Sequence, residues 1–215
     1  MRFIRSPHSV VILAAYALGG AALLVGFPNA AAPAWSHEPV PWSAPIAAFM
    51  LPTAMLVTDW LLRGLCVRHP VDTQDGADDL AINDAIMLRF LLFLLGVHVM
   101  VLLGMEGLLQ GRPWAGQVVP VMLGLTMISI GNLLPRTRPN LAIGIRTRRM
   151  LLDRALWMRT HRSTGYLLVI CGIVIVLSAL AVPSPVGPGM ILLVGPGILI
   201  ATCLIVWHGR RSEHH

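Results

Sequence analysis

The feature that most constrains this chain is a series of apolar runs long enough to cross a membrane. A hydrocarbon core of about 30 Å takes about 20 helical residues to span. Hydrophobic residues make up 56% of the 215 positions and charged residues 12%, whereas ordinary soluble domains are about 25% charged. We therefore predict an all-α polytopic membrane bundle forming a single domain. The six predicted spans lie near residues 9–27, 44–62, 85–103, 115–134, 166–182 and 190–207.

The basic residues are all arginines, and they are unevenly shared between the predicted loops. Of the 16, fourteen lie in the two termini, the 2–3 loop and the 4–5 loop, whereas the other three loops hold one. Cytoplasmic loops carry the excess of positive charge. We therefore expect both termini in the cytoplasm. Topology also accounts for the net charge of +6, so we expect no nucleic-acid partner.

The first span has two interpretations. The sequence from Asn29 to Ala34 resembles a signal-peptidase site, so cleavage there is one alternative. The run from Ser9 to Phe27 is longer than a usual signal core, however, and a retained span places both ends of the chain on one side. We expect the span to be retained.

Three ionisable residues stand inside predicted spans, where charge is costly and often functional. Asp59 and Arg89 lie near the cytoplasmic ends of spans 2 and 3. Either they form a buried pair, or each reaches water separately. His98 lies near the middle of span 3 and is either a neutral, hydrogen-bonded core histidine or a proton relay. It has no His, Asp or Glu three or four residues away, so we expect no metal site.

Motifs of known enzyme classes are absent from the sequence. It contains no GxSxG, no HExxH and no Walker loop. We predict a protein that is not an enzyme and needs no cofactor.

A polar segment, Gly131–Gly165, separates the fourth and fifth predicted spans and holds half of the basic residues. A tether would need only charge, but this segment also has residues that set backbone shape. Asn132 stands at the end of span 4, where its amide could satisfy helix carbonyls. Pro135 should end that helix, and Gly144 permits a turn that a side chain would forbid.

The second half of this segment predicts a helical run that Asp153 begins and His161 ends. On a helical wheel, Arg159 and Arg162 fall on the same side as Leu152 and Ala155. This pattern does not suit a simple surface helix. We expect a segment tucked against the bundle, with arginines that meet carboxylates, helix ends or anionic lipid headgroups.

The most specific pattern in the chain is a set of residues with fixed spacing inside Gly131–Gly165. The set is Gly131, Asn132, Pro135, Arg136, Arg138, Asn140, Gly144, Ile145, Arg146, Thr147, Leu151, Trp157, Thr160, His161 and Arg162. In order and spacing it resembles the signature of the SdpI family, membrane proteins named for immunity to a secreted sporulation-delaying toxin. Arg148-Arg149-Met150 replaces the family's Pro-Trp-Thr.

The resemblance implies a six-span protein of the bacterial cytoplasmic membrane, with the signature as its binding segment. It implies protection against a peptide toxin, or signalling through a sequestered cytoplasmic regulator. Two alternatives stay open from the residues themselves. One is a small-molecule or proton-coupled transporter that uses Asp59, Arg89 and His98. The other is an integral-membrane enzyme that uses His98 or His161.

Overall fold

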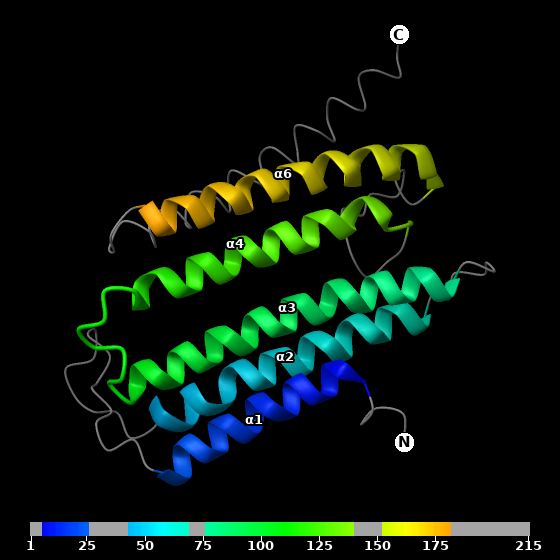
Figure 1. Ribbon diagram of the computed structural model, residues 1–215. Coiled ribbons are helices and arrows are strands. Elements are labelled where there is room, and N and C mark those ends of the chain that lie inside the picture. Colours follow the sequence, from blue (N-terminus) through cyan, green and yellow to red (C-terminus); the bar gives the residue numbers. More distant parts are fainter. Residues whose placement is uncertain (1–5, 26–42, 69–75, 140–151, 182–215) are drawn as a thin grey trace. The chain divides into compact units, whose positions relative to one another are not determined.

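The computed structural model describes residues 6–25, 43–68, 76–139 and 152–181, and this part of the chain is helical with short connections (Figure 1). It contains five α-helices and a short 3₁₀ helix, and no strand is found in the described ranges. The predicted all-α fold is therefore confirmed. The elements are α1 (Pro7–Val25), α2 (Ser43–Arg68), α3 (Gly76–Met105), α4 (Ala115–Leu133), η2 (Leu134–Arg136) and α6 (Arg154–Ala181).

Four of these helices are long and apolar enough to cross a membrane. They cover Pro7–Leu24, Ala81–Met105, Ala115–Arg136 and Arg154–Ala181, which correspond to predicted spans 1, 3, 4 and 5. Helix α2 stands where the second span was predicted but is not one of the four. The sixth predicted span, 190–207, lies outside the described residues. A membrane protein is thus supported, and the number of six spans stays a prediction.

The chain divides into two compact units. The first, Met1–Leu61 with Phe90–Ala115, contains α1, most of α2 and the second half of α3. Helices α1 and α2 are antiparallel and very close, because a β-carbon added at Gly19 would collide with the carbonyl oxygen of Ala48. Further along the same pair, Tyr16 Oη lies 3.0 Å from Thr53 Oγ1. A small residue thus sets the spacing of this helix pair, as in many membrane proteins.

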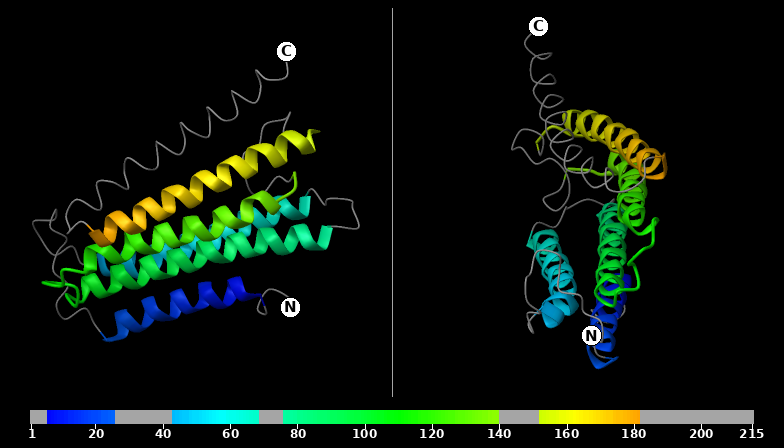
Figure 2. Two further views of the ribbon diagram at one scale, coloured as in Figure 1. Left: turned by 45° about the horizontal axis from the view of Figure 1, so that its top comes forward. Right: turned by 90° about the vertical axis from the view of Figure 1, so that its left-hand side faces the viewer.

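The second unit, Leu62–Arg89 with Gly116–His215, contains the first half of α3 together with α4, η2 and α6. Helices α4 and α6 run side by side (Figures 1 and 2). They meet at two glycine pairs, Gly124 with Gly172 and Gly131 with Gly165. The two glycines of each helix are seven residues apart, or about two turns, so one face of each helix carries both contacts.

Local sequence explains where α4 ends and α6 begins. Pro135 stands two residues after the last residue of α4 and lies in η2, which confirms that the α-helix ends at this proline. At α6, the Asp153 carboxylate accepts hydrogen bonds from the backbone N–H groups of Ala155 and Leu156, at 2.9 and 3.0 Å. This is an N-cap. The predicted run from Asp153 and the fifth predicted span are one uninterrupted helix.

Candidate functional site

The described part of the signature centres on Trp157, whose side chain is completely buried in the second unit. Its Nε1–H donates to the backbone oxygen of Thr137 at 3.0 Å. Thr137 follows η2, and both its N–H and its hydroxyl donate to Leu134 O, at 3.1 and 2.7 Å. Trp157 thereby fixes the start of α6 to the chain that leaves α4. A buried indole N–H normally needs such a partner.

His161 lies one turn after Trp157 and is also completely buried. The two rings are stacked, with centroids 3.9 Å apart and planes 14° from parallel. The His161 Nδ1 atom lies 3.0 Å from the Trp157 carbonyl oxygen. A carbonyl oxygen can only accept, so Nδ1 carries the hydrogen and the ring orientation is fixed. The predicted helical run therefore packs inward through its Trp and His.

Two buried polar atoms on this face of α6 have no hydrogen-bond partner among the described residues. They are His161 Nε2 and Thr164 Oγ1. Residues three apart on a helix are neighbours, so the two atoms belong to one turn. Buried polar atoms are nearly always hydrogen-bonded in native proteins, and an unsatisfied one costs about 1–3 kcal/mol. Thr164 was missed in the sequence because the signature ends at Arg162.

A glycine contact adjoins this pair. A β-carbon at Gly165 would lie 2.6 Å from Gly131 O and 3.1 Å from the Pro135 ring. The first and last residues of Gly131–Gly165 are therefore in contact, and Pro135 packs beside them. This contact brings together the two ends of the segment that was predicted as one functional unit.

Eight other signature residues divide into three groups. Thr160 is buried on the same side of α6 as Trp157. Asn132, Arg136 and Arg162 are exposed, and no hydrogen bond of the Asn132 amide is found within the described ranges. The predicted residues Asn140, Gly144, Arg146 and Thr147 lie outside the described residues.

Asp59, predicted as an intramembrane polar residue, is buried in the first unit and pairs with His8. His8 Nδ1 donates to Asp59 Oδ1 at 2.9 Å, and both side chains are about 1–2% exposed. The sequence did not single out His8, because a histidine close to the N-terminal arginines is typical of a chain end that is exposed to solvent. The pair joins the start of α1 to the second half of α2.

Arg89 finds its partners in the second unit. Its Nε donates to Ser129 Oγ of α4 at 2.6 Å, and its Nη1 donates to Ala85 O at 2.7 Å. The predicted pair with Asp59 would join the two units, so it stays a prediction. Ser129 gave no signal in the sequence, because serine is common inside membrane helices for reasons of size alone.

His98 is completely buried in the first unit, and its Nε2 donates to the backbone oxygen of Ala15 at 3.1 Å. The predicted hydrogen bond inside the bundle is therefore present. Nδ1 of the same ring has no partner among the described residues. Within those residues no three His, Cys, Asp or Glu side chains gather as metal ligands would.

The comparisons with known proteins address the signature directly. The sequence model of the SdpI/YfhL protein family matches residues 136–208. The C-terminal part of this chain is therefore similar in sequence to the SdpI/YfhL family. The match confirms the resemblance seen in the residues. Searches of curated proteins and of solved structures gave no match.

The SdpI/YfhL match covers most of the signature residues described above. It includes η2's Arg136, the whole of α6 and therefore the Trp157–His161 stack. Asn132 and Pro135 stand just before it. The Trp157–His161 stack, the bond from Trp157 to Thr137 O and the unpartnered atoms of His161 and Thr164 all lie within the matched residues.

Proposed function

We propose that this SdpI-family membrane protein protects a cell against a peptide toxin or signals the toxin's presence to a cytoplasmic regulator. It does so by binding, without catalysis, from the cytoplasmic membrane, with both termini in the cytoplasm. The family match supports the membrane role, and the arginine distribution supports the orientation.

The observation that carries this proposal is the unpartnered pair, His161 Nε2 and Thr164 Oγ1. With Nδ1 carrying its hydrogen, a neutral His161 offers Nε2 as an acceptor, and the Thr164 hydroxyl can donate. A peptide amide has one donor and one acceptor, so it suits both atoms. Because Trp157 and Nδ1 hold the ring, the acceptor is preorganised, which lowers the entropic cost of binding.

Two conservative substitutions test this role. Thr164→Val removes the hydroxyl with little change of shape, and His161→Asn keeps a donor for the Trp157 carbonyl while removing Nε2. Cells expressing each variant are exposed to the secreted sporulation-delaying toxin, with membrane insertion checked by immunoblot. We expect protection to be lost in both variants and kept in Thr126→Val, whose hydroxyl already donates to Met122 O at 2.8 Å. Full protection by both site variants would refute the proposal.

Proton-coupled transport is a second candidate, favoured by the buried polar groups of the first unit. The His8–Asp59 pair and the free Nδ1 of His98 are titratable groups inside an apolar unit, and such groups mark proton pathways in many transporters. Proteoliposomes that contain the full chain and a pH-sensitive dye measure this directly. Proton flux that Asp59→Asn abolishes would favour transport over immunity.

A further inference from the structure

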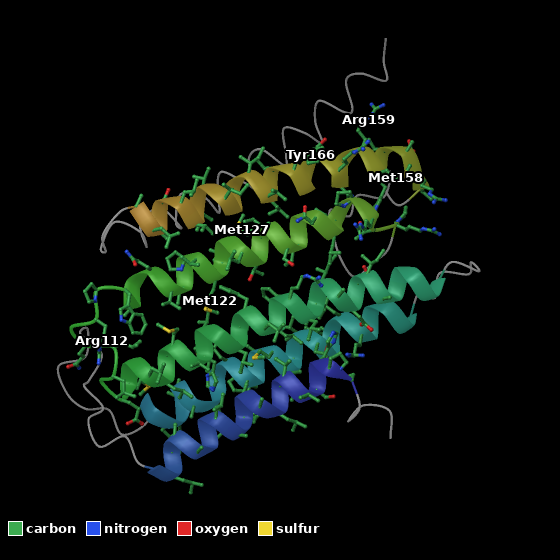
Figure 3. All side chains as sticks on the ribbon, in the orientation of Figure 1. Arg112, Met122, Met127, Met158, Arg159 and Tyr166 are labelled. Atoms are coloured by element: carbon green, nitrogen blue, oxygen red, sulfur yellow. The ribbon has the colours of Figure 1, made fainter. Side chains whose placement is uncertain are left out.

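Helix α6 has a continuous exposed face that changes character along its length. The face begins with Leu152, just before α6, and continues on the helix with Arg159, Arg162, Tyr166 and Ile170. These residues are spaced by seven, three, four and four positions, and all five are exposed. At about 100° per residue these positions share one side of the helix. Figure 3 shows Arg159 and Tyr166 projecting from the side of α6 away from α4. The face continues through Ile173, Leu177 and Leu180.

The exposed face of α6 changes from charged to apolar at Tyr166, whose side chain is 58% exposed. Tyrosine is enriched where a membrane meets water. From Tyr166 to Leu180 the helix rises about 21 Å, most of a hydrocarbon core of about 30 Å. Arg162 lies one turn before Tyr166, about 6 Å along the axis, and therefore at the depth of lipid headgroups.

Both arginines on this face are available to a ligand. No hydrogen bond or ion pair joins either guanidinium to another described residue. They lie three residues apart and are therefore neighbours on the helix surface. Guanidinium groups bind phosphate through two parallel hydrogen bonds. No acidic residue stands on this face, so its charge has no compensation within α6.

We propose that Arg159 and Arg162 bind the headgroup phosphate of an anionic phospholipid, with Tyr166 at the interface and the acyl chains along Ile170 to Leu180. Charge complementarity selects the occupant, because anionic lipid attracts basic groups at the membrane surface whereas zwitterionic lipid does so weakly. The apolar continuation beyond Tyr166 distinguishes a lipid from a soluble anion. The site lies on the outer face of α6, so it is independent of the toxin role proposed for the buried face.

The test uses the purified full chain in detergent, titrated with phosphatidylglycerol in the presence of phosphatidylcholine and followed by native mass spectrometry. Arg159→Gln/Arg162→Gln should weaken phosphatidylglycerol retention about 30-fold, from about 1 kcal/mol for each arginine. Arg154→Gln is the matched control. Arg154 is exposed on the same helix but about 140° around the axis from Arg159.

Single substitutions at Arg159 or Arg162 should each weaken retention about fivefold, whereas Arg154→Gln should leave it unchanged. Equal losses in all three variants would show a general charge effect and overturn the site. Unchanged retention in the double variant would also overturn it. A third outcome would overturn the site as well, namely a double variant that changes its oligomeric state but retains lipid as before. The face would then bind a second copy of the chain. Helical content measured by circular dichroism shows that each variant is folded.

Discussion

Gly131 and Gly165 face each other where α4 and α6 meet, and neither position has room for a side chain. A β-carbon on Gly131 would lie 2.7 Å from Gly165 O, and one on Gly165 would lie 2.6 Å from Gly131 O. Two turns away, Gly124 and Gly172 repeat the arrangement, at 2.6 and 2.5 Å. Backbone contact at both points fixes the register of the two helices that hold the signature.

Gly131→Ala should therefore destabilise the protein. The added methyl meets backbone rather than a flexible side chain, so the helices must separate, at a cost of about 1–3 kcal/mol. Thermal unfolding in detergent, followed by circular dichroism, measures the effect. Gly20→Ala is the control, since nothing lies within 4 Å of its β-carbon position. An unchanged melting temperature for Gly131→Ala would contradict the contact.

Trp157→Phe should destabilise the start of α6. The smaller phenyl ring fills only part of the buried site and cannot donate to Thr137 O. The lost hydrogen bond costs about 1–3 kcal/mol, and the lost ring volume adds to this cost. The melting temperature should fall, and the Thr137–Leu134 region should exchange amide hydrogens faster. Trp114 is 48% exposed, so Trp114→Phe should change the free energy of unfolding by less than about 0.5 kcal/mol.

Thr164→Val should raise the melting temperature of the ligand-free protein while abolishing protection. Removing a buried hydroxyl that lacks a partner relieves a desolvation cost of about 1 kcal/mol or more. Thr126→Val removes a hydroxyl that is already bonded, so it should give no such gain. A fall in the melting temperature of Thr164→Val would mean that the hydroxyl is satisfied, and the ligand argument would then fail.

The His8–Asp59 pair predicts a measurable coupling between α1 and α2. A double-mutant cycle with His8→Ala and Asp59→Ala should give a coupling free energy of about 0.5–3 kcal/mol. The same cycle at the exposed Tyr16–Thr53 bond should give a smaller value, because water competes for that bond. Additive effects of His8→Ala and Asp59→Ala would show that the pair does not stabilise the unit.

Several features of the site could be predicted from the sequence, and others could not. Pro135 ends α4 as expected, because proline removes a donor wherever it stands. The inward packing of Trp157 and His161 was expected only as a tucked segment. The partners His8, Ser129 and Thr164 were not found, because a lone histidine, serine or threonine carries no periodic signal. Their roles depend on what another helix places beside them.

The sequence by itself determined the helices, the membrane character and the family signature, since each depends on local composition or on fixed spacing along the chain. Only the tertiary structure decided which faces meet: Gly131 with Gly165, His8 with Asp59 and Arg89 with Ser129. The physical reason is the solvent. Lipid tails are as apolar as leucine, so hydrophobic patterning does not separate the face that packs on a helix from the face that meets lipid. Close packing and a few hydrogen bonds make that choice, and both arise only between residues far apart in the chain.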